Sequence, residues 1–148
     1  MAANMGLKFR KAAVICLIAA AALILAGCQF RPDVVSARSH SEGQQEVVQV
    51  TLRSADAKAI KNRQQYFSLV IINCTGKLER YPAEPTIGGQ RASDFHFPTD
   101  GETVQIIGKV PAKIFEQYVQ PCAFLEGGGY LTGTIKSSVA PIVRDSKV

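Results

Sequence analysis

The strongest strand signal in the chain is Tyr66-Phe67-Ser68-Leu69-Val70-Ile71-Ile72-Asn73-Cys74. This stretch is rich in β-branched and aromatic residues, which favour extended backbone. Its two alternating faces are both largely apolar, a pattern typical of a strand that is covered on both sides in the middle of a sheet. The sequence therefore predicts a central strand over 66–74, with the other elements arranged around it.

The segments on either side of this strand are predicted to be short strands and turns. Residues 46–53 alternate apolar and polar side chains with a period of two, as a half-buried strand does. Residues 102–110 resemble them, with an irregularity near Gly108. A hairpin is expected from 120–126 and 130–138 around Gly127, Gly128 and Gly129. A short extended piece is expected at 94–97, and short helices at 54–64 and 111–118.

This pattern of five to seven short strands, with little helix and no alternation of strand and helix, predicts an all-β fold. The form expected is a small immunoglobulin-like β-sandwich or a cracked barrel, with one disulfide and one or two short helices. The chain contains no tryptophan, whereas immunoglobulin domains normally pack one against their disulfide. The likeness is therefore one of architecture only.

The N-terminal segment has the three parts of a secretory signal. Lys8, Arg10 and Lys11 precede 15 consecutive apolar residues (12–26), and the segment closes on Leu25-Ala26-Gly27-Cys28. These four residues resemble the lipobox of the bacterial lipoprotein family, which is an aliphatic residue, a small residue, Gly or Ala, and then Cys. A membrane span needs about 20 apolar residues, so an uncleaved transmembrane helix is the less favoured alternative, as is a secreted protein without lipid.

The resemblance to lipoproteins implies cleavage between Gly27 and Cys28. It also implies palmitate-type acylation, with a diacylglycerol on the Cys28 sulfur and an acyl chain on its amine, and no other cofactor. The next residue is Gln29, whereas an Asp at this position favours retention in the inner membrane of enterobacteria-like cells. We therefore expect a lipid-anchored protein of the cell envelope, in the outer membrane and facing the periplasm or the surface.

Removal of the signal changes the charge and cysteine content of the chain. Three of its 17 basic residues lie in residues 1–27, which leaves 14 basic against 12 acidic side chains and a net charge of +2. For a near-neutral domain in the cell envelope, we expect no nucleic-acid partner. Cys16 lies in the signal and Cys28 is the lipid site, so Cys74 and Cys122 are predicted to form a disulfide in an oxidising compartment. Two buried free thiols are the alternative, and no metal site is expected.

Four parts of the chain are distinguished by composition. Residues 1–27 are the predicted signal peptide, and residues 28–44 are the lipidated N-terminus followed by a polar, flexible tether. Residues 45–142 are the predicted β-domain, and residues 143–148 are a C-terminal tail.

Few residues suggest catalytic chemistry. Asp94 and His96 share one face of an extended segment near Asp100, but a zinc site needs three or four ligands and usually more His or Cys. Nucleophilic catalysis needs a base and an orienting group beside the nucleophile, and no such set is evident. We therefore expect a protein that is not an enzyme. Aromatic side chains near turns could instead form a patch that binds protein, namely Tyr81, Phe95, Phe97, Tyr118 and Tyr130.

The function expected on these grounds is that of a membrane-anchored accessory or assembly subunit. It would bind another envelope protein in a secretion, pilus or conjugation apparatus, and its oligomeric state is left open. The alternatives are a periplasmic inhibitor or exclusion factor, for example against lysozyme, and a carrier of small ligands.

Overall fold

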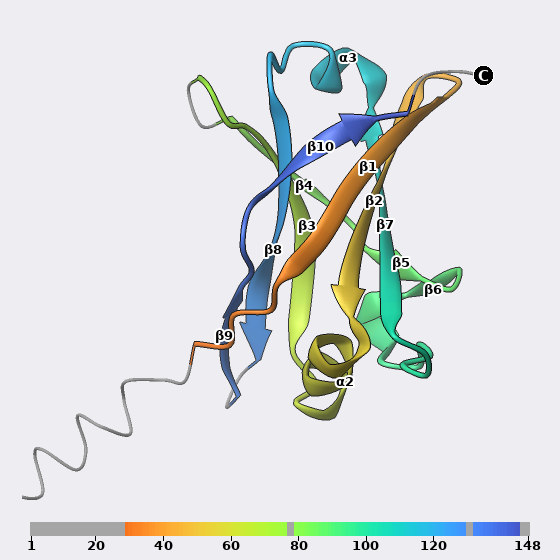
Figure 1. The fold of residues 1–148 in the computed structure, drawn as a ribbon, viewed down its shortest axis with the longest axis vertical. Coiled ribbons are helices and arrows are strands. Elements are labelled where there is room, and N and C mark those ends of the chain that lie inside the picture. The colour runs from red at the N-terminus through yellow and green to blue at the C-terminus, as the bar shows by residue number, and fades with distance from the viewer. Residues whose placement is uncertain (1–28, 77–78, 130–131, 146–148) are drawn as a thin grey trace, which may run out of the picture.

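In the computed structural model of the chain, the apolar stretch forms strand β3 (Tyr66–Asn73), which has a neighbouring strand on each side (Figure 1). The structure describes residues 29–76, 79–129 and 132–145. The predicted signal peptide and Cys28 lie outside these residues. The predicted central strand is confirmed.

The described elements are nearly all strands, joined by short turns. In chain order they are β1 (Val34–Glu42), β2 (Gln45–Arg53), α2 (Ser54–Asn62), β3, β4 (Arg80–Ala83), β5 (Thr86–Ile87), β6 (Gln90–Arg91), a 3-10 turn (Ala92–Asp94), β7 (Thr103–Pro111), α3 (Ala112–Phe115), β8 (Pro121–Gly129), β9 (Gly133–Lys136) and β10 (Ala140–Arg144). The all-β prediction with two short helices is confirmed.

The strands follow one hydrogen-bonded path, β4-β3-β8-β10-β1-β2-β7-β5-β6, with β9 beside β8. Strand β10 joins the two halves of this path, because it pairs antiparallel with β8 and parallel with β1. The sheet curls so that the two halves face each other (Figure 1). The facing halves are sandwich-like, and the continuous path between them is the feature expected of a cracked barrel.

A single apolar core fills the space between the two halves. Leu69 and Ile71 of β3 belong to the same buried cluster as Val50 of β2 and Ile106 of β7. Gly108 of β7 shows how closely the halves pack, since a Cβ atom there would lie 2.8 Å from a Leu69 methyl group and 3.1 Å from the Ala83 Cβ. The irregularity predicted at Gly108 is therefore a close approach between layers, inside an unbroken β2–β7 register.

Helix α2 covers one end of the curled sheet (Figure 1). Ala57 and Ile60 are 1% exposed and belong to the core, while the rest of the helix is largely polar. Alanine and lysine favour helix, and Asp56 in the first turn and Lys61 in the last complement the helix dipole. No described helix has the length and apolar character needed to cross a membrane.

The predicted flexible tether over 28–44 is wrong from residue 30 onward, because Phe30 pairs with Ile135 and β1 occupies Val34–Glu42, with paired strands on both sides. Its inward-facing residues include Ala37 and Ser39, which are buried but small. After Val34 and Val35 the strand therefore lacks the large apolar side chains that mark a strand in sequence. The predicted boundary at residue 142 is also too early, because β10 includes Val143 and Arg144.

The predicted disulfide is confirmed between Cys74 and Cys122, whose Cα atoms are 5.9 Å apart. Cys74 follows the end of β3, and Cys122 lies in β8, which pairs directly with β3. The bridge therefore joins neighbouring strands of one layer. In this respect the structure differs from the immunoglobulin arrangement, in which the bridge joins two sheets.

The glycine run 127–129 belongs to strand β8 and is not the tip of the predicted hairpin. It pairs with β3 on one side and β9 on the other. A Cβ atom on Gly127 would overlap the backbone of Tyr66 and Phe67. Glycine is thus required here by the close approach of two strands.

Candidate functional site

The outer face of the β4–β3–β8 layer carries an apolar floor. Because side chains alternate along a strand, Leu69 and Ile71 of β3 point into the core while Val70 and Ile72 point outward. Val70 and Ile72 form a second cluster with Cys122 and Phe124 of β8, separate from the main core. On an antiparallel sheet with one solvated face, outward positions are usually polar, so this apolar floor is unusual.

An arginine–glutamate pair covers the floor. Arg80 Nη2 of β4 lies 2.5 Å from Glu126 Oε2 of β8. Arg80 is in register with Ile72 and Glu126 with Ser68, so the pair crosses β3 diagonally. The Arg80 guanidinium also lies 5.6 Å from the centre of the Phe124 ring. These two long side chains, each about half exposed, help to cover a floor whose four residues are 2–7% exposed.

A shallow groove lies on each side of this pair. One groove, of about 340 Å³, is lined by Ser68, Val70 and Pro82 together with the pair. The other, of about 260 Å³, is lined by Ile72, Phe124, Lys136, Val139 and the same pair. The Val139 side chain is 49% exposed. We call these residues with Cys122 the outer-face groove. Its exposed apolar side chains are Pro82 and Val139, which are flanked by one carboxylate and two cations.

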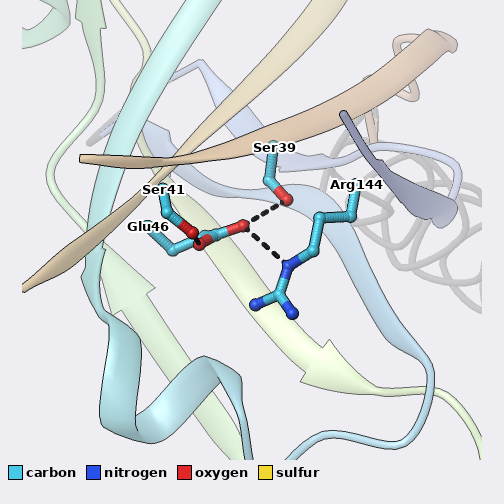
Figure 2. A network of polar contacts seen from close by, with 4 residues as sticks. All are labelled: Ser39, Ser41, Glu46 and Arg144. Atoms are coloured by element: carbon cyan, nitrogen blue, oxygen red, sulfur yellow. Dashed lines mark hydrogen bonds and ion pairs between the residues drawn. The ribbon is translucent and has the colours of Figure 1, made fainter. Parts of the chain in front are cut away.

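A second site, formed by polar side chains, lies at the end of the sheet remote from α2. Glu46 of β2 is fully buried and accepts hydrogen bonds from Ser39 Oγ (2.7 Å) and Ser41 Oγ (2.8 Å) of β1. Arg144 of β10 donates from Nε to the same carboxylate at 3.2 Å (Figure 2). The Arg144 guanidinium lies 5.1 Å from the centre of the Phe115 ring of α3. We call Glu46, Ser39, Ser41 and Arg144 the Glu46 network.

The surroundings of Glu46 favour the ionised form of its carboxyl group. Burial by itself raises the pKa of the Glu46 carboxyl, but the hydrogen bonds from Ser39, Ser41 and Arg144 and the charge of Arg144 outweigh burial and lower the pKa below its usual value. A carboxylate whose pKa is lowered in this way is a weak proton acceptor at neutral pH. The network is suited to joining β1, β2, β10 and α3.

Asp94 and His96 do not share a strand face. Asp94 ends the 3-10 turn, Phe95 has a left-handed backbone (φ 55°), and the predicted extended piece at 94–97 is wrong. His96 Nδ1 contacts the Asp94 carbonyl oxygen. Across the described residues, no group of three or more His, Cys, Asp and Glu side chains is placed to hold a metal ion.

The predicted aromatic patch does not form one surface. Phe97 and Tyr118 are buried, Tyr81 packs partly against the core, and Tyr130 lies outside the described residues. Burial and the nearby charge of Glu79 raise the pKa of Tyr118. Phe95 is half-buried and lies edge-on to Tyr66, with ring centres 5.0 Å apart.

Sequence reasoning missed both the outer-face groove and the Glu46 network. The apolar character of both faces of 66–74 is a signal for the floor of the groove, but the same pattern is typical of a strand covered by a layer on each side. Nothing local in sequence indicates that Arg80 and Arg144 would reach Glu126 and Glu46, because those pairs form across strands distant in the chain. Comparison with known proteins finds no family model, curated protein or solved structure that matches this chain.

Proposed function

We propose that this protein is a lipid-anchored envelope lipoprotein that binds another envelope protein through its outer-face groove and performs no catalysis. The observation that carries the binding role is the exposed apolar side chain of Val139, next to a covered apolar floor of Val70, Ile72 and Phe124 on the outward side of the sheet. Binding surfaces commonly combine an apolar centre with arginine and a polar rim. Arg80, Glu126 and Lys136 supply such a rim.

The anchoring role rests on the lipobox Leu25-Ala26-Gly27-Cys28 and its place after a basic and then apolar segment. One acyl chain holds a protein only marginally at a membrane, whereas two or more give stable attachment. Acylation of Cys28 on both sulfur and amine supplies that number. Gln29 in place of Asp supports the outer membrane as the location, and we propose a role as accessory or assembly subunit of an envelope apparatus.

The test is site-specific photocrosslinking of the full chain in cells. A photoreactive amino acid in place of Val139, which lines the groove, should give a discrete adduct with one protein. The same photoreactive amino acid in place of Gln105, an exposed residue of β7, should give no such adduct. Arg80→Glu places a second acid beside Glu126 and should abolish the Val139 adduct. Cys28→Ser should remove palmitate labelling and reduce the adduct by detaching the protein from its membrane.

Two outcomes would contradict the proposal. Equal palmitate incorporation in the wild type and Cys28→Ser would reject the anchor. An adduct from Val139 that persists unchanged in Arg80→Glu, or an identical adduct from Gln105, would reject the groove as the binding surface.

A further inference from the structure

The chain is fixed to the domain within two residues of the proposed lipid site. Phe30 pairs with Ile135 of β9; its N–H donates to the Thr134 carbonyl (2.9 Å) and its carbonyl accepts from the Lys136 N–H (3.1 Å). The Pro32 carbonyl accepts from the Ser138 N–H at 3.2 Å, and the Val34 N–H donates to Ser138 Oγ at 2.9 Å. The N-terminal segment therefore leaves the domain from a defined place beside β9.

This attachment also involves helix α2. The Arg63 guanidinium, just after the helix, lies 4.9 Å from the centre of the Phe30 ring. The Asp33 N–H donates to the Asp56 carboxylate at 3.3 Å. Phe30 itself is partly buried against the core. The segment that precedes β1 is thus held against the same end of the molecule that α2 covers (Figure 1).

The covalent distance to Cys28 is short. Two residues of fully extended chain span about 7 Å. The headgroup layer of a bilayer is about 5–8 Å thick on each side of the hydrocarbon core. A flexible tether over residues 29–44 would instead give a root-mean-square separation of about 20–24 Å. With the acyl chains of Cys28 in the hydrocarbon, Phe30 lies at headgroup depth.

We infer that the α2 end of the domain rests on the membrane surface through Phe30, Lys58, Arg63, Tyr66 and Phe95, which we call the anchor-side surface. This inference rests on the proposed acylation of Cys28. Lys58 and Arg63 are exposed cations, and Tyr66 is 57% exposed and lies edge-on to Phe95. Aromatic rings and long basic side chains are the groups that favour the interface between water and lipid, and anionic headgroups attract the cations.

This geometry fixes the direction in which the domain points. Strand β1 starts near the anchor-side surface and rises by about 3.3 Å per residue over nine residues. The β1–β2 turn therefore lies up to roughly 30 Å further from the bilayer. The end of β10 lies at that distal end (Figure 1), where Arg144 of β10 donates to Glu46 at the start of β2.

The experiment compares the depth of two labels on the processed, lipidated protein. Lys58→Cys places a single free thiol at the anchor-side surface, and Gln44→Cys places one in the β1–β2 turn. Each protein is labelled with an environment-sensitive fluorophore and reconstituted into vesicles of phosphatidylethanolamine and phosphatidylglycerol that contain a headgroup quencher. We expect quenching at least threefold stronger at position 58 than at position 44.

A third variant tests whether the short chain between Cys28 and Phe30 is what holds the domain at the membrane. Insertion of ten Gly and Ser residues between Gln29 and Phe30 should leave vesicle attachment unchanged and reduce quenching at position 58 toward the level at position 44. Equal quenching of the two labels in vesicle-attached protein would overturn the contact between the anchor-side surface and the bilayer, but not the proposed acylation of Cys28. The anchor-side surface would then be open to a protein partner. Unmodified Cys28 in the mass spectrum of the mature N-terminus would overturn the anchor, and with it this inference.

Discussion

Glu46 occupies an inward position of β2, where the following inward side chains are Val48, Val50 and Leu52. A charge in such a place destabilises a fold unless hydrogen bonds and a counter-charge compensate for its burial. Ser39, Ser41 and Arg144 supply this compensation. The first residues of β2, the strand β1 and the last residue of β10 are therefore joined by one carboxylate.

We predict that Glu46→Ala lowers the free energy of unfolding at pH 7 by about 2–3 kcal/mol, because it removes a buried ionic acceptor and leaves Ser39 without its partner. Glu46→Gln, which preserves shape, should cost less. Urea unfolding followed by circular dichroism measures both. Glu42→Gln, an exposed carboxylate of the same hairpin, is the matched control and should change stability much less; an equal loss would contradict the role of Glu46.

The lowered pKa of Glu46 also sets the sign of a pH effect. Its contribution to stability is fully present above the usual pKa of 4.5 and is lost as the pH falls through the lower pKa of the folded state. The difference in stability between wild type and Glu46→Gln should therefore shrink in acid below pH 4.5. A difference that grows in acid would contradict this assignment.

At the scale of elements, the sequence predicted the strands with a clear period of large apolar residues and missed β1 and β10, which have none. Strands β2, β3 and β7 show clear apolar periods, and each was predicted within one or two residues. Strand β1 was missed because Ala37 and Ser39 are its buried residues. Its parallel pairing with β10 joins segments at opposite ends of the domain, and no local pattern reports such a contact.

The disulfide links the end of β3 to β8, two strands that already pair over a long antiparallel register. The two cysteines are 48 residues apart in sequence, and closing a loop of that length stabilises a fold by roughly 4 kcal/mol in the chain-entropy model. We predict that Cys74→Ala combined with Cys122→Ala lowers the free energy of unfolding by about 3–4 kcal/mol.

Dithiothreitol provides the control for this prediction. The reductant should lower the urea midpoint of the wild type and leave that of the double alanine variant unchanged. A double variant as stable as the oxidised wild type would show that the β3–β8 ladder alone fixes these strands.

At the scale of the whole molecule, helix α2 and the β1–β2 turn lie at opposite ends of the curled sheet (Figure 1), and Glu46 lies at the start of β2, next to that turn. The strands of the β4–β3–β8 layer run between these ends. An anchor-side surface on the bilayer would therefore leave the outer-face groove on the side of an upright domain, open to a partner in the same compartment. The two proposals are compatible because they use different surfaces.

Closure of the fold depends on β10, which alone connects the β8 half of the sheet path to the β1 half among the described strands. Ala140 and Ile142 are buried in the core, and Arg144 is the counter-charge of Glu46. Loss of a buried isoleucine side chain alone costs about 2–5 kcal/mol, and a domain of this size has about 5–15 kcal/mol in total.

We therefore predict that truncation after Val139 abolishes cooperative unfolding, whereas removal of a β10 side chain that faces solvent does not. Val143→Ser is the matched variant, because Val143 is 61% exposed and its substitution keeps the backbone pairing with β1. Urea titration by circular dichroism should give a two-state transition for Val143→Ser and a broad, non-cooperative change for the truncated protein. A truncated protein that kept a sharp transition near the wild-type midpoint would mean that the two halves are held by core packing without the strand that joins them.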